Sequence, residues 1–144
     1  MSSFWLSWRS LLHGVLLIFL GAGGIGCQSP TPPSEASAQY GELVQQAVAQ
    51  AEARRDTAFF WLSNTSNTRA RSLMLELGLD YLRYDRAADI LCTWSGEGLQ
   101  PARGYVTAPS AGNAPIDSIG PLCNIEGTCS AEPVTESWSR FRCE

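Results

Sequence analysis

The sequence predicts a mainly α domain, in which a helical hairpin is followed by an irregular, disulfide-tied C-terminal region with possible short strands. Two observations predict this class. Apolar residues recur at helical intervals in two segments between residues 37 and 92. After Cys92 the chain becomes rich in Gly, Pro, Ser and Asn and carries three further cysteines. A length of 144 residues suits a single domain of this kind.

The segment from Ser37 to about Ala58 predicts the first helix, because one face is apolar while Glu, Gln and Arg occupy the other positions. Packing of this face on its own domain is favoured over a coiled-coil stripe, since the pattern does not last three heptads. Phe59 to Leu62 then predict core residues, and residues 64–68 supply cap and turn types. The apolar positions of the helix are Tyr40, Leu43, Val44, Ala47, Val48 and Ala51.

The segment 69–92 predicts a second helix that completes an αα-hairpin. The competing interpretation is a strand over residues 75–81, where leucines and a tyrosine alternate with Glu76, Gly78 and Asp80. We favour the helix for residues 73–84, because residues 85–91 continue the helical period with few β-branched residues. The helical stripe would contain Leu73, Leu77, Tyr81, Tyr84, Ala88 and Leu91.

The first 26 residues have the three parts of a signal peptide: Arg9 near the start, an apolar stretch, and small residues before a cleavage site. The apolar stretch of 15 residues from Leu11 to Ile25 would span about 22 Å as a helix, less than the roughly 30 Å of a bilayer core. Residues 27–36 are rich in Pro and Ser and predict an extended tether. Residues 37–144 would then form the single globular domain.

Residues 24–27, Gly-Ile-Gly-Cys, resemble the lipobox of bacterial lipoproteins. The resemblance implies cleavage after Gly26 and a lipid anchor on Cys27, in which diacylglycerol carrying fatty acids such as palmitate is linked to the cysteine sulfur. It also implies sorting to the outer membrane of a Gram-negative cell, facing the periplasm, because no Asp follows the cysteine. A cleaved secretion signal and an uncleaved anchor are the alternatives.

Lipid on Cys27 also accounts for the odd number of cysteines, which is 5. Cys92, Cys123, Cys129 and Cys143 then form an even set that predicts two disulfides in an oxidising periplasm. All three pairings are open, and Cys123–Cys129 with Cys92–Cys143 ranks first because the former closes a small local loop. Spacings without a C-x₂-C unit favour disulfides over zinc.

The residue types remaining after signal cleavage argue against most catalytic chemistry. The single histidine is His13, inside the signal peptide, so histidine bases, histidine metal sites and Ser-His-Asp triads are excluded from the mature chain. No phosphate loop is present, and no cofactor or metal is predicted. A carboxylate-dependent peptidoglycan hydrolase using Glu76 or Glu97 is the enzymatic alternative, although a solvated surface role is favoured for both residues.

Charge and aromatic content bear on the partners. Loss of residues 1–26 removes one arginine and leaves more acidic than basic residues, so binding to nucleic acid or anionic lipid through bulk charge is not expected. Arg140 and Arg142 form a weak candidate patch for an acidic partner. Five aromatic residues are predicted to pack in the core, with a peptide or glycan groove as the alternative. They are Trp61, Trp94, Tyr105, Trp138 and Phe141.

Taken together, these features predict a membrane-anchored lipoprotein of the cell envelope that is not an enzyme. It would bind an envelope protein partner or act as an accessory component. A secreted, disulfide-stabilised inhibitor-like module is a further alternative.

Overall fold

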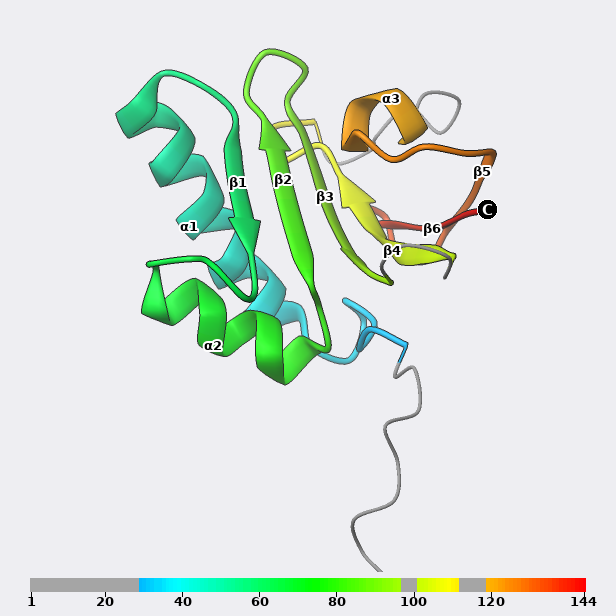
Figure 1. Cartoon of the computed structure of the whole chain (residues 1–144). Helices are drawn as coiled ribbons and strands as arrows, with labels where there is room; N and C mark the ends of the chain where they lie inside the picture. The colour runs from blue at the N-terminus through cyan, green and yellow to red at the C-terminus, as the bar shows by residue number, and fades with distance from the viewer. Residues whose placement is uncertain (1–28, 97–100, 112–118) are drawn as a thin grey trace, which may run out of the picture.

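An antiparallel sheet of six strands is the largest element of the computed structural model, with strand order β1-β2-β3-β4-β6-β5 (Figure 1). The structure describes residues 29–96, 101–111 and 119–144. The prediction of a mainly α domain is therefore wrong, and the fold is mixed α and β. The elements in chain order are α1 (Ser37–Arg54), β1 (Ala58–Trp61), α2 (Thr68–Leu77), β2 (Tyr81–Asp85), β3 (Ile90–Ser95), β4 (Ala102–Thr107), α3 (Ile119–Cys123), β5 (Cys129–Pro133) and β6 (Ser139–Cys143).

The first predicted helix is confirmed as α1, which buries an apolar stripe spaced three and four residues apart. It ends at Arg54, before the expected Ala58, because Arg55 takes the left-handed conformation with φ of 57°. The backbone N–H of Arg55 donates to the carbonyl of Glu52 and so satisfies one of the helix's last carbonyls. The buried residues of α1 are Tyr40, Leu43, Ala47 and Ala51.

The second predicted helix is only half right. Asn67 caps the start of α2 by accepting the backbone N–H of Ala70 at 3.0 Å. Gly78 ends the helix with φ of 69°, a conformation that glycine adopts without steric cost. Residues 81–85 then form β2, so a helix through residues 73–84 is wrong and the strand-like alternation was the better guide to the second part.

The predicted αα-hairpin is also corrected, because β1 lies between the two helices in the chain. Both helices nevertheless contact each other and lie on the same side of the sheet. The expectation of core residues at 59–62 holds for Phe60, which is buried, and is wrong for Phe59 and Trp61. The alternation follows from the strand, in which neighbouring side chains point to opposite faces.

The sheet has a buried cluster on each face. On the face covered by α1 and α2, which we call the helix-pair face, Leu82, Leu91 and Tyr105 pack against the two helices. On the opposite face, called the α3 face, Ile90, Val106 and Phe141 form a second cluster with α3. The domain therefore has three layers across part of its width.

The four C-terminal cysteines form two disulfides, as predicted, but the pairing ranked first is wrong. Cys92 in β3 is bonded to Cys123 at the end of α3, and Cys129 in β5 is bonded to Cys143 in β6. Strand pairing explains the second bond, since Cys129 and Cys143 lie directly opposite each other in the β5–β6 register. This is the sequential pairing among the three that the sequence left open.

Residues 30–36, which fall in the segment expected to be a tether, lie against the domain. The Thr31 backbone N–H donates to the Leu77 carbonyl at 2.9 Å, and Pro30 and Pro33 are buried. The Tyr40 hydroxyl donates to the Thr31 carbonyl at 2.9 Å. Residues 30–36 are therefore part of the folded unit and not a free tether.

Candidate binding surfaces

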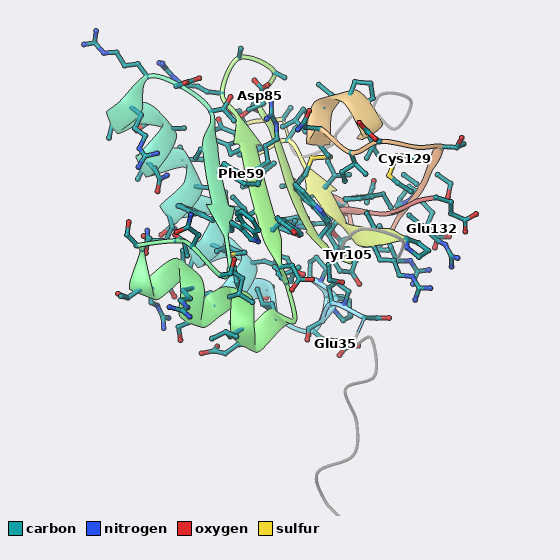
Figure 2. The ribbon with its side chains drawn as sticks, in the orientation of Figure 1. Glu35, Phe59, Asp85, Tyr105, Cys129 and Glu132 are labelled. Atoms are coloured by element: carbon teal, nitrogen blue, oxygen red, sulfur yellow. A yellow bond between two sulfur atoms is a disulfide. The ribbon has the colours of Figure 1, made fainter. Side chains whose placement is uncertain are left out.

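The helices leave two areas of the sheet uncovered. On the helix-pair face, α1 packs on β1 and β2 and reaches β4 at Tyr105, so β6 and β5 extend beyond the helices. On the α3 face, α3 packs on β3 and β5 and leaves the β1 side uncovered. Figure 2 shows Phe59 on β1 and Glu132 toward the opposite side of the sheet. The uncovered area on the α3 face carries aromatic side chains, and the one on the helix-pair face carries arginines.

The uncovered area on the α3 face carries four aromatic side chains from three adjacent strands, which we call the aromatic row: Phe59, Trp61, Tyr81 and Trp94. The strand register brings them together, since Trp61 lies opposite Tyr81 and Tyr81 lies opposite Trp94. Phe59 is 46% exposed and Trp61 is 43% exposed, whereas Trp94 is buried. The inner end of the row, at Trp94, therefore belongs to the second core cluster. Its outer end, on β1, is an exposed apolar surface at the edge of the sheet.

The rings of the aromatic row stand nearly parallel to one another. The ring centroids of Tyr81 and Trp94 are 5.1 Å apart with 19° between the planes, and those of Trp61 and Tyr81 are 6.0 Å apart with 27° between the planes. Phe59 and Tyr81 are stacked at 6.3 Å. Stacked rings turn their faces toward each other, so this surface is suited to apolar side chains more than to a planar ligand that needs a free ring face.

Gly104 in β4 makes room for the inner end of the row. It lies opposite Trp94 in the β3–β4 register. A Cβ atom built on Gly104 would lie 1.8 Å from the carbonyl oxygen of Thr93 and 2.7 Å from the Cβ of Trp94. Only a residue without a side chain therefore allows β4 to approach the Trp94 position this closely.

Arg83 lies on the same face as the aromatic row, opposite Phe59 in the register. Its Nη2 contacts Asp85 at 3.4 Å, and its buried Nε has no hydrogen-bond partner among the described residues. A buried donor without an acceptor destabilises the folded state. Arg83 thus places one cation at the border of the apolar surface.

The uncovered area on the helix-pair face contains a hollow of about 510 Å³, which we call the arginine groove. Arg103, Arg140 and Arg142 project from β4 and β6, where Arg103 lies opposite Arg142 and Tyr105 lies opposite Arg140. Directly opposed residues share a face, so the three guanidinium groups belong to one surface. The residues lining the hollow are Ser29, Pro30, Arg103, Gly104, Tyr105, Ser130, Ala131, Glu132, Arg140, Phe141 and Arg142.

Two of the three arginines have carboxylate partners. Arg140 donates from Nε to Glu132 at 2.9 Å, and its Nη2 contacts the same oxygen. Hydrogen bonding to Glu132 raises the pKa of Arg140 further above its usual value. Arg142 pairs with Glu144 at 2.7 Å. For Arg103, no ion pair is found within the described part of the chain, so its full charge faces the groove.

Tyr105 connects the groove to the N-terminal segment. Its hydroxyl donates to the Pro30 carbonyl at 3.4 Å, and its ring meets that of Tyr40 edge to face at 5.9 Å. Burial raises the pKa of the Tyr105 phenol, and Glu35 raises it as well, whereas Arg140 lowers it. Tyr105 therefore stays protonated near neutral pH and keeps Pro30 at the rim of the groove.

Several predicted site residues lie outside the described residues or away from both surfaces. Cys27, Glu97 and His13 are outside the described residues. Glu76 is exposed on α2, accepts a hydrogen bond from Ser72 and does not line the arginine groove.

The aromatic residues named from the sequence are divided among three places. Trp61 and Trp94 belong to the aromatic row, Tyr105 and Trp138 pack around Tyr40 in the first cluster, and Phe141 is in the second cluster. Phe59 and Tyr81 were missed as surface residues. They could have been found from the alternation of side chains along β1 and β2, because every second residue of a strand points to the same face.

Across residues 29–96, 101–111 and 119–144, no three His, Cys, Asp or Glu residues are grouped so as to hold a metal ion. In the same ranges, no helix has the length and apolar character to cross a membrane.

A comparison of the chain with protein-family models, curated proteins and solved structures found no match, so the function has to be argued from the two surfaces themselves.

Proposed function

We propose that this protein is a lipid-anchored component of the bacterial cell envelope that binds a protein partner through the aromatic row and performs no catalysis itself. The anchor is the acylated Cys27 implied by the lipobox resemblance of residues 24–27. The two disulfides support an oxidising compartment, because such bonds persist outside the reducing cytosol.

The observation that carries the binding role is the exposed end of the aromatic row. Contiguous exposed apolar surface marks interaction sites on soluble domains, and Trp, Tyr and Phe are enriched in the cores of protein interfaces. Phe59 and Trp61 are among the most exposed large apolar side chains of the described residues. Their stacked rings suit the apolar side chains of a protein more than a glycan.

The carboxylate hydrolase has less support. Glycoside hydrolysis needs two carboxyl groups about 5 to 9.5 Å apart beside a cleft. Glu76 instead lies exposed on the surface of α2, where it accepts a hydrogen bond from Ser72.

The binding role is tested by photo-cross-linking in the native cell. A photoreactive amino acid at Trp61 is expected to trap a discrete partner, and the same substitution at Leu75 is the control. Leu75 is 61% exposed on α2, so it matches Trp61 in exposed apolar character but lies outside the row. Adding Phe59→Ser should abolish the cross-link from position 61. Equal cross-linking from positions 61 and 75 would contradict the proposal.

The anchor is tested separately by labelling cells with radioactive palmitate. The chain with its native Cys27 should carry the label, and the Cys27→Ala variant should not. If the protein with its native Cys27 is found in the medium without label, the secreted inhibitor-like module is favoured instead.

A further inference from the structure

We propose that the arginine groove binds the phosphates of lipid headgroups, so that the domain docks by this face on the bilayer that holds its anchor. The inference rests on the lipid attachment proposed above, and it adds the orientation of the domain and a second, electrostatic contact with the membrane.

The position of the groove is the first argument. Ser29 and Pro30 line it, and Cys27 precedes Ser29 by two residues. A chain spans at most about 3.6 Å per residue, so the Cα atoms of Cys27 and Ser29 are no more than about 7 Å apart. An acyl chain on Cys27 therefore keeps the headgroup layer close to the groove.

The chemistry of the groove is the second argument. Arginine binds phosphate with parallel N–H donors in a fixed fork and stays charged at all physiological pH values. The side chains of Arg140 and Arg142 remain 59% and 48% exposed despite their ion pairs, so part of each guanidinium faces solvent. Arg103 adds a guanidinium with no ion pair in the described part of the chain.

The acidic residues beside the groove limit how far its attraction reaches. Glu132 and Glu144 offset two of the three positive charges locally, and the whole chain has a net charge of −4. Attraction to an anionic surface is screened within about 10 Å at ordinary ionic strength. The groove is therefore expected to act at short range and to orient a domain that the acyl chains already hold at the bilayer.

The experiment uses residues 27–144 with Cys27→Ser, so that the groove is measured without the acyl chains. Co-sedimentation compares vesicles of phosphatidylcholine with vesicles that also contain phosphatidylglycerol. The key variant is Arg103→Ala with Arg142→Ala. Its matched control is Arg54→Ala with Arg71→Ala, which removes the same charge from exposed positions on α1 and α2. Circular dichroism and the disulfide map establish that each variant is folded.

The expected result is preferential binding to the phosphatidylglycerol vesicles. Each arginine at an anionic surface contributes about fivefold, so the groove variant should bind about 30-fold more weakly while the control pair changes little. Glu132→Gln removes a negative charge from the rim and should bind about fivefold more tightly. Because circular dichroism establishes that this variant is folded, the increase reports the charge at the rim.

Three results would overturn the proposal. They are equal binding to both kinds of vesicle, equal losses in the groove variant and the control pair, and binding of inorganic phosphate in the groove without any preference for anionic vesicles. Because the acyl chains are absent from this assay, its outcome is independent of palmitate labelling. A failed anchor and a failed groove are therefore told apart.

Discussion

At the level of single residues, Gly104 controls how closely β3 and β4 approach below the aromatic row. Gly104→Ala would place a methyl group against the Thr93 carbonyl and the Trp94 backbone. Overpacking of this kind costs about 1–3 kcal/mol of stability. Urea denaturation should show this loss, together with altered tryptophan fluorescence. Gly41→Ala is the control, since a Cβ there meets nothing within 4 Å. Equal stability of the two variants would contradict the proposed close approach.

Glu42 and Arg69 join α1 to α2 through two hydrogen bonds of 2.6 and 2.5 Å. Hydrogen bonding to Arg69 lowers the pKa of Glu42. The pair therefore stabilises the folded state fully above the unfolded-state pKa of glutamate, about 4.3, and loses this effect as the pH falls through the lower folded-state pKa.

The expected consequence is measured by comparing Glu42→Gln with the unsubstituted chain in denaturant titrations between pH 7 and pH 2. The stability difference should be present at neutral pH and should shrink toward zero in strong acid. In an Arg69→Gln background, the same comparison should show little dependence on pH. A difference that persists unchanged in acid would exclude the ion pair as its cause.

At the level of elements, each disulfide closes a different part of the C-terminal half. The bonded cysteines are separated by 31 residues in Cys92–Cys123 and by 14 in Cys129–Cys143. Loop-closure entropy predicts losses of about 4 and about 3 kcal/mol when each pair is replaced by alanines. Urea titration of the two double variants measures both values, and the smaller loss is expected for the shorter loop.

The pairing itself is tested by peptide mapping without reduction. Trypsin cuts after Arg103 and Arg140, and cleavage after Glu126 separates Cys123 from Cys129, so the four cysteines fall on four peptides. The Cys92 peptide should be linked to the Cys123 peptide. A link between the peptides of Cys123 and Cys129 would instead support the pairing that ranked first from the sequence.

The helices could be predicted from sequence more readily than the strands, because helical contacts repeat within one segment. The error after Leu77 has a local cause in residues 85–91, whose period resembles that of a helix. There the Asp85 side chain accepts the backbone N–H groups of Ala87 and Ala88, and Asp89 takes φ of 52°, so the segment turns from β2 to β3. A side chain that caps a turn competes with the helix for the same backbone groups.

The surfaces depend on strand register, which short-range patterns do not contain. Arg140 and Arg142 could be noted as a patch from their spacing, but Arg103 joins them only because β4 pairs with β6. Likewise, Trp61 and Trp94 are neighbours only through Tyr81, which lies between them in the sheet. The cysteine pairing was missed for the same reason, since the β5–β6 register places Cys129 opposite Cys143.

At the level of the whole molecule, the aromatic row and the arginine groove lie on opposite faces of the sheet and toward opposite edges. Substitutions at distant sites without shared partners have additive effects. We therefore expect Trp61→Ser to leave binding to phosphatidylglycerol vesicles unchanged. Conversely, Arg103→Ala with Arg142→Ala should leave the cross-link from a photoreactive residue at position 61 intact.

An effect of the groove variant on the cross-link from position 61, or of Trp61→Ser on vesicle binding, would contradict this arrangement. If the groove variant lost the cross-link in a detergent extract, where no bilayer is present, the two surfaces would have to belong to one interface. An unchanged cross-link there, with lost vesicle binding, is the outcome expected of a domain that uses one face for lipid and the other for protein.

Both sulfur bridges lie in the same half of the fold: they join β3 to α3 and β5 to β6, whereas α1, β1, α2 and β2 contain no half-cystine. One sheet runs through both halves, and the cluster on the helix-pair face takes Leu91 from β3 and Tyr105 from β4, so loss of the bridges is expected to loosen the packing under the helices as well. Recombinant material made without export to an oxidising compartment is therefore expected to be less stable throughout the domain, with four free thiols in place of the two bridges.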